Sequence, residues 1–314
     1  MSIDGRMMPV MHGQQTVATR ADMRRTDSQF QFDNWLFRQL AGDGRSADII
    51  RLDRSLVWTL HPAKRSYREC ALSGCGSAMK PEPEKQPKDK EKPREPSEAK
   101  CPLTVKSNEF SVLASGEKKR INTFDTEQFL LKWKLEMQDP QKQVARNEVV
   151  LELWTTPENG QIRDVKRINE SFEQRWRSAT RPAEHPFGRY VPPDVVASMA
   201  SLIRGAGTKS FAKWANDMKK IHGYPILTKM SWSASGNVCS DQRGDAKASA
   251  SSTPTSVGGL LGGLIAGQAT SEMADRASSG ALLTFTHEVQ TIAVKPVADT
   301  SFLPPPDYQK EATR

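Results

Sequence analysis

Hydrophobic and polar residues alternate with a period of two through several parts of this chain, most clearly in residues 48–69. The alternation is interrupted at 53–55 and 61–64, where polar and turn-forming residues gather. This pattern predicts three short antiparallel strands with one buried face. The apolar positions of the predicted meander are Ile50, Leu52, Leu56, Trp58 and Leu60.

The strongest strand pattern covers residues 127–154. Strict alternation in 127–137 and in 144–154, separated by Gln-Asp-Pro-Gln, predicts a long hairpin. Residues 109–113 and 118–121 predict two further strands on either side of a Ser-Gly-Glu turn. The alternating apolar positions of the hairpin are Phe129, Leu131, Trp133, Leu135, Val149, Leu151 and Leu153.

Helical spacing is found mainly between the predicted hairpin and the next predicted strand. Residues 170–180 are amphipathic, 193–203 begin with a proline, and 210–223 end with a glycine, all of which are helix signals. Residues 31–40 also carry apolar residues at helical or irregular spacing. We expect the helix at 210–223 to lie against the sheet through Phe211, Trp214, Ala215, Met218 and Ile221.

The chain returns to strand patterns after this helix. A strand is predicted from Tyr224 onward and another at 281–294, and residues 300–309 are expected to form an exposed tail. The predicted fold class is therefore α+β, mostly antiparallel β, with a few helices covering the sheet.

Two stretches do not fit into a packed core. Residues 78–101 are a charged, proline-rich polyampholyte, and 241–280 are rich in Ser, Ala and Gly, so both are expected to be long disordered insertions. They divide one domain into a first sheet block at 1–77, a second sheet block with helices at 102–240, and a last strand and tail at 281–314.

The net charge of +8 comes from Lys and Arg residues interleaved with Asp and Glu along the 314-residue chain. This distribution favours a generic basic surface over a dedicated nucleic-acid or anionic-lipid patch. No helix-turn-helix, RNP or zinc-knuckle spacing is present in the sequence, so we expect no nucleic-acid partner. No run of about twenty apolar residues occurs either, and we expect no transmembrane span.

The four cysteines favour disulfide bonds in an oxidising compartment. Cys70 is expected to pair with Cys75, and Cys101 with Cys239, because Cys-x4-Cys is too loose for a zinc knuckle and no histidine lies near. Free thiols in a cytosolic protein remain the alternative. The first 25 residues lack the apolar region of a signal peptide, so export would need a targeting segment upstream of the given start.

The sequence offers no catalytic constellation. Its five histidines are scattered, and it has no GxSxG, P-loop or GxGxxG motif, so we expect neither an enzyme nor a metal or cofactor site. The glycines Gly259, Gly263 and Gly267 are spaced for close packing of a helix against another helix or lipid, as in a lid. A flexible apolar loop is the alternative for this stretch.

The aromatic, Leu and Met side chains of the predicted sheet and helix allow two interpretations. They form either an ordinary core or the lining of a cavity for an acyl chain. The residues expected to line such a cavity are Trp58, Phe129, Trp133, Leu135, Leu151, Trp214 and Met218.

Four short segments carry a family resemblance, in this order along the chain: 56–69, 116–124, 219–226 and 302–310. Through them the chain resembles a group of uncharacterised exported bacterial proteins whose fold is similar to that of the periplasmic lipoprotein carrier LolA and its receptor LolB. The resemblance implies an incomplete antiparallel β-barrel closed by a few helices, with a concave apolar face that can hold lipid. It brings no catalytic residues.

These observations lead to one expected function and one alternative. We expect a non-enzymatic periplasmic protein that binds a lipid or a lipoprotein acyl chain in a half-barrel cavity, with an envelope protein as a further partner. The alternative is a structural or interaction protein of the cell envelope whose core is filled by its own side chains and holds no ligand.

Overall fold

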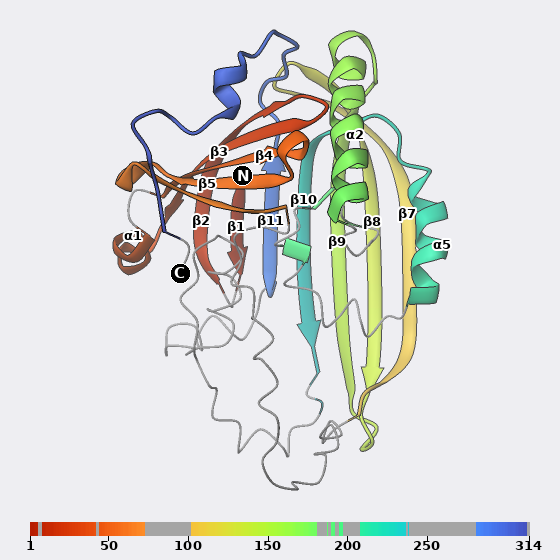
Figure 1. The fold of residues 1–314 in the computed structure, drawn as a ribbon. Helices are drawn as coiled ribbons and strands as arrows, with labels where there is room; N and C mark the ends of the chain where they lie inside the picture. Colours follow the sequence, from red (N-terminus) through yellow and green to blue (C-terminus); the bar gives the residue numbers. More distant parts are fainter. Residues whose placement is uncertain are drawn as a thin grey trace, which may run out of the picture.

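The computed structural model describes residues 1–5, 8–41, 44–72, 102–180, 187, 190–191, 195–196, 208–236, 238 and 281–312. The described strands form one sheet in the order β12-β6-β5-β4-β3-β2-β1-β11-β10-β9-β8-β7. All neighbours are antiparallel except β12 and β6, which are parallel, and the sheet is open because β12 and β7 lie at opposite ends. The predicted fold class, a mostly antiparallel sheet accompanied by few helices, is thus confirmed (Figure 1).

The strands carry the following bounds: β1 (Ser2–Gly5), β2 (Met8–Thr19), β3 (Met23–Phe32), β4 (Arg45–Arg51), β5 (Leu56–His61), β6 (Ser66–Ala71), β7 (Thr104–Ile121), β8 (Phe124–Gln138), β9 (Val144–Thr156), β10 (Tyr224–Ser235), β11 (Leu283–Glu288) and β12 (Gln309–Lys310).

The predicted meander is confirmed as β4, β5 and β6. Short 3-10 turns join its strands, η1 at Leu52–Arg54 and η2 at Pro62–Lys64. Each turn ends in a residue with left-handed backbone, Ser55 with φ 55° and Arg65 with φ 47°, whose N–H donates to the carbonyl three residues earlier. The two polar breaks in the alternation are therefore the two reversals of the chain.

The predicted hairpin is also confirmed, as β8 and β9, but the expected Ser-Gly-Glu turn is wrong. Residues 104–121 form the single strand β7, and both of its halves pair with β8. The register shifts between Ala114 and Lys118, and Gly116 there has φ +79°. A bulge inserts extra residues without reversing the chain, and its glycine looks the same in sequence as the glycine of a turn.

The helices whose bounds the structure describes are α1 (Trp35–Ala41), α2 (Gly160–Thr180) and α5 (Thr208–Met218). Helix α2 begins ten residues before the predicted start at 170, and α5 ends before the glycine that was expected to terminate it. Gly223 follows a separate turn with φ +82°. Only Val195 and Val196 of the helix predicted at 193–203 are described, and both are buried.

The register of the strands divides the side chains between two faces of the sheet. Ile3 lies beside Met11 and Phe285, Phe285 beside Met230, and Met230 beside Leu151, so one face is continuous from β1 to β9. This face also carries Phe30, Leu131 and Trp133, and we call it the inner face. Ile49, Trp58 and Leu60 lie on the other face, which we call the outer face. Ile49 pairs with Arg25 of β3, and Arg25 and Phe30 point to different faces because they are five positions apart in the same strand.

The C-terminal residues 289–311 cross the outer face, and we call this segment the strap. Its first part packs Val289 and Ile292 against a cluster of Ile121, Trp154, Ile226 and Leu227. Its second part inserts Phe302, with no exposed surface, between Ile49, Trp58 and Leu60. The expected exposed tail at 300–309 is therefore wrong, because its few apolar residues cover apolar side chains that the sheet would otherwise leave in water.

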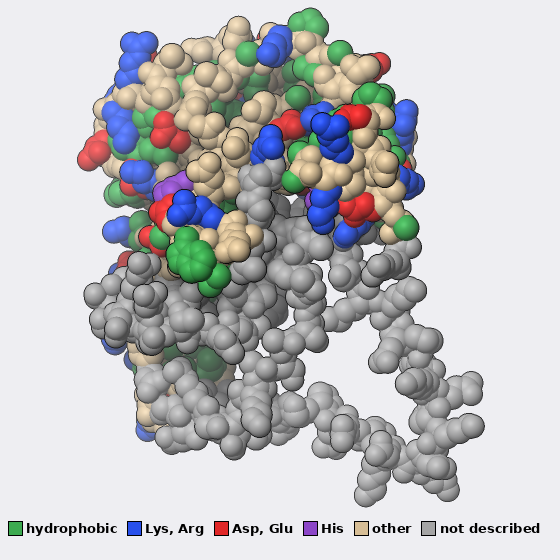
Figure 2. Space-filling view, turned by 90° about the vertical axis from the view of Figure 1, so that its left-hand side faces the viewer, with side chains coloured by type: hydrophobic (Ala, Val, Ile, Leu, Met, Phe, Trp, Pro, Cys, Tyr) green, Lys and Arg blue, Asp and Glu red, His purple; other side chains and the backbone are tan. Residues whose placement is uncertain are grey.

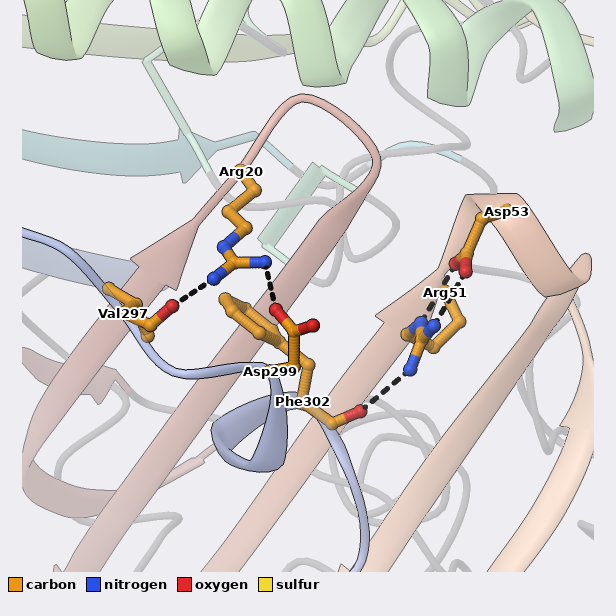
Figure 3. Close-up of polar contacts among 6 residues, drawn as sticks. All are labelled: Arg20, Arg51, Asp53, Val297, Asp299 and Phe302. Carbon is orange, nitrogen blue, oxygen red and sulfur yellow. Dashed lines mark hydrogen bonds and ion pairs between the residues drawn. The ribbon is translucent and has the colours of Figure 1, made fainter.

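Arginines fasten the strap to the sheet (Figure 3). Arg20 donates to the Val297 carbonyl and pairs with Asp299 at 2.5 Å. The buried Arg51 donates to the Phe302 carbonyl at 3.2 Å and makes two bonds to Asp53, at 2.8 and 2.5 Å. These bonds satisfy backbone carbonyls that have no place in a strand ladder.

The predicted insertions at 78–101 and 241–280 lie outside the described residues. Cys70, near the end of β6, is disulfide-bonded. Cys75, Cys101 and Cys239 fall outside the described residues, so both predicted pairings stay predictions. In the described part of the chain, every helix is too short or too polar to cross a bilayer.

Candidate ligand-binding site on the inner face

The inner face has an apolar half, formed by β1–β3 and β8–β11. The alternating apolar side chains of the long hairpin are at most 2% exposed. Met230 and Phe285 continue them across β10 and β11, next to the polar pair Thr228 and His287. The members of this half are Ile3, Met11, Phe30, Phe32, Phe129, Leu131, Trp133, Leu135, Val149, Leu151, Leu153, Met230, Leu283 and Phe285.

A cap from the connection between α2 and β10 covers this half. The cap comprises Phe187, Tyr190, Val191, Val195, Val196, α5 and Ile221. Its aromatic rings meet those of the sheet: the Trp214 ring centre lies 5.0 Å from that of Trp133 and 4.9 Å from that of Phe110 on β7. Phe187 lies 5.8 Å from Trp133. Offset and edge-on ring contacts of this kind each add about 0.5–1.5 kcal/mol to the burial of the rings.

Polar groups mark the end of the cap where it joins β10. His222 lies 2.5 Å from the Glu127 carboxylate and packs edge-on against Phe129. Thr155 lies beside Glu127 in the ladder, and its buried hydroxyl has no hydrogen-bond partner among the described residues. Gly223 touches this threonine, and a Cβ at Gly223 would meet the Thr156 carbonyl at 2.6 Å. The chain therefore enters β10 through a closely packed turn.

The other half of the inner face, on β4–β6, carries polar residues beside an apolar row of Ile50, Val57 and Cys70. The strand register places Asp48, Thr59 and Arg68 side by side, with His61 and Ser66 as the next pair. Thr59 donates to the Asp48 carboxylate at 2.7 Å. Desolvation by the surrounding protein raises the pKa of Asp48, against the opposing effects of this bond and of His61. The residue is nonetheless exposed to solvent.

Helix α2 spans the inner face near the tip of the β2–β3 hairpin. Its Phe172 is buried under the Arg24 guanidinium, 4.0 Å from the ring centre, and Glu173 pairs with the same arginine at 2.5 Å. The side chains of Asn169 and Tyr224 share a hydrogen bond, and burial raises the pKa of that tyrosine against the opposing effects of Arg24 and of this bond. The helix thereby ties the first sheet block to the start of β10.

Six of the seven residues predicted to line a cavity come together here. Phe129, Trp133, Leu135, Leu151 and Trp214 share the core of the apolar half, and Met218 packs against it. Trp58 does not belong to this set. It lies on the outer face against Phe302, and its indole N–H donates to Glu69 at 2.9 Å. Alternation shows which residues share a face of a sheet, but not which face a helix covers.

Several residues of this half were missed in the sequence. Phe187, Tyr190 and Val191 are buried although they follow a stretch with no periodic pattern, and Phe285 belongs to a strand whose inner residues were not identified. The inner residues of this strand could have been identified from the alternation of the apolar Leu283 and Phe285 with polar neighbours. Phe187, Tyr190 and Val191 carry no periodic signal in the sequence, because only the tertiary fold brings them onto the sheet.

Figure 2 shows the side of the molecule that carries α1. Trp35 and Leu36 on this helix are 67% and 48% exposed, and Phe37 packs its ring 6.0 Å from that of Phe32. The apolar residues predicted at 31–40 therefore do not form one buried face, since Phe32 belongs to β3. Within the described ranges, no three His, Cys, Asp or Glu side chains converge in a way that could hold a metal ion.

The inner face thus combines a largely apolar surface, an aromatic cap that covers it, and polar residues on β4–β6. Comparisons of the chain with family models, curated proteins and solved structures return no match.

Proposed function

We propose that this chain is a non-enzymatic, periplasmic half-barrel protein that holds a lipid or a lipoprotein acyl chain on the apolar half of its inner face. One observation carries the proposal. The apolar half is covered by a cap that does not belong to the sheet and that meets it through side chains such as Trp214 and Phe187. A ligand with a flexible apolar chain can replace such side-chain contacts without breaking a strand ladder.

The energetics suit an exchange of cap for ligand. Burying an acyl chain is worth about 0.8 kcal/mol per CH₂, and displacing the cap costs the burial of its own rings, about 3–5 kcal/mol for each large aromatic side chain. A long acyl chain therefore offsets the loss of two or three aromatic contacts. The polar residues Asp48, Thr59 and His61 of β4 and β5 would remain next to the ligand's head group.

Ligand binding is tested first on protein purified from the cell envelope under non-reducing conditions. Native mass spectrometry with lipid extraction should detect an acyl species bound to the folded chain. Delipidated protein should then bind a fluorescent fatty acid.

The variant Trp214→Ala should bind this probe more tightly than the wild type, because a weaker cap raises the population of the open form. Trp35→Ala removes an exposed tryptophan and is the matched control. Ligand-free protein that binds no probe in any of the three forms would overturn the proposal.

The second candidate is an envelope interaction protein with a self-filled core. It is favoured by the close packing of the cap, since Trp133 and Trp214 are only 1% and 2% exposed. For this candidate, Trp214→Ala lowers stability and leaves probe binding at zero.

A further inference from the structure

The strand β7 forms one end of the sheet, and its outer edge has no neighbouring strand among the described residues. Most of its side chains are exposed, and Leu113 is 60% exposed. A free strand edge presents unpaired N–H and C=O groups that an extended chain can pair with. At the opposite end of the sheet, the short strand β12 pairs with the edge of β6. Among the described residues, the long edge of β7 has no such partner strand.

The regular part of this edge is short and well defined. Bulges interrupt the register of β7 between Val105 and Ser107 and again between Ala114 and Lys118. Between them, residues 107–114 pair continuously with β8. An added strand could therefore extend the ladder over about eight residues, the usual length of a strand.

The charges beside this edge define the partner. Beyond the second bulge, Lys118, Lys119 and Arg120 are all exposed, and none of them forms an ion pair with a residue that the structure describes. Glu127 and Asp125 of β8 lie opposite Lys118 and Arg120 in the ladder, so the basic side chains outnumber the acidic ones here. Helix α5, which lies beside β7 in Figure 1, adds the exposed Lys213. An acidic group opposite this end of β7 would be attracted, and a basic group repelled.

A second copy of the chain does not fit this requirement. Antiparallel pairing of two β7 strands about their regular part places residues 101–103 of one copy opposite Lys118, Lys119 and Arg120 of the other. That stretch contains no acidic residue. Self-pairing would thus leave the basic end uncompensated.

We propose that the free edge of β7 binds an extended segment of a partner protein, a strand that is acidic at its N-terminal end and apolar at alternate positions after it. The segment adds antiparallel to β7. Main-chain hydrogen bonds to residues 107–114 supply the affinity, and the acidic end next to Lys118 and Arg120 sets the direction and register. Leu113 and Val112 contact its apolar side chains on the two faces.

The probe for this proposal is a synthetic twelve-residue peptide with four glutamates followed by alternating valine and threonine. Hydrogen exchange of the full chain should show protection of β7 amides within 107–114 when the peptide is added, and fluorescence anisotropy should give its affinity. A peptide with four lysines in place of the glutamates should bind at least tenfold more weakly.

Variants on the protein separate the edge from general charge effects. Lys118→Glu with Arg120→Glu should weaken the acidic peptide about tenfold and improve the lysine peptide. Lys132→Glu is the matched control, since Lys132 is exposed on β8, which is paired on both sides. Leu113→Lys places a charge beside the edge and should reduce the binding of both peptides without lowering stability.

Three results would overturn the proposal: equal affinity for the two peptides, protection elsewhere than on β7, or concentration-dependent self-association of the protein that Leu113→Lys abolishes. The last result would assign the edge to a second copy of the chain. None of these outcomes depends on lipid binding, so the proposal stands or fails separately from the proposed function.

Discussion

Phe302 is the anchor of the strap, and replacing it by alanine tests whether the strap behaves as one unit. The side chain has no exposed surface and fills the space between Ile49, Trp58 and Leu60. Truncation of a fully buried phenylalanine costs about 3–5 kcal/mol, through lost burial and the cavity left behind. Since 1.4 kcal/mol corresponds to a factor of ten, opening of the strap should become about 100- to 4,000-fold more frequent.

Hydrogen exchange followed by mass spectrometry measures this opening at a distance from the substitution. The amides of Gln309 and Glu311 donate to the carbonyls of Arg65 and Tyr67 at 2.9 and 2.8 Å, and they should lose their protection together in Phe302→Ala. Val294→Ala is the control on the same segment, because Val294 is 44% exposed, and it should leave both amides unchanged. Unaltered exchange at Gln309 and Glu311 in Phe302→Ala would refute the idea that the buried ring holds the strap.

Three further predictions concern the same sheet. Arg51→Met leaves the Phe302 carbonyl without its donor and should lower the free energy of unfolding by about 1–3 kcal/mol in urea titrations, whereas equal stability would show that water replaces the bond. The pKa of Glu69 is lowered by its lysine partner and by an indole N–H, so this carboxylate stabilises the fold above its unfolded pKa and the contribution is lost as the pH falls through its folded pKa. Glu69→Gln should therefore flatten the acid limb of a pH–stability curve, and an unchanged limb would contradict the assignment. Gly13→Ala would bring a Cβ to 2.1 Å from the Phe30 ring and should lower the melting temperature by several degrees, and a neutral effect would mean that the ring moves aside freely.

The strands of this fold follow from the sequence to a large extent, because a half-buried antiparallel strand carries its own period of two. That is why the meander at 48–69 and the hairpin at 127–154 were predicted at nearly their observed positions. The bulge at Gly116 was not, since a glycine flanked by polar residues is common to turns and bulges.

The assignment of faces needed the structure. Trp58 and Trp133 have the same alternating surroundings in the sequence, yet they lie on opposite faces, one under the strap and the other under the cap. The strap and the cap residues Phe187, Tyr190 and Val191 follow no periodic pattern in the sequence, whereas α5 of the cap does. From the sequence, only the site residues on the strands and on α5 could be predicted.

The position of β11 has a consequence for the order in which the protein can be completed during synthesis. This strand, residues 283–288, lies between β1 and β10 and is the link in the sheet between the strands of residues 2–71 and those of residues 104–235. A nascent chain that has not yet emerged beyond about residue 290 holds two half-sheets, each with an open edge where the other belongs. The sheet can therefore be completed only after the C-terminal residues have been synthesised. A chain that ends before β11 should hold two separate half-sheets with open edges and should aggregate, although it lacks only a small part of the sequence.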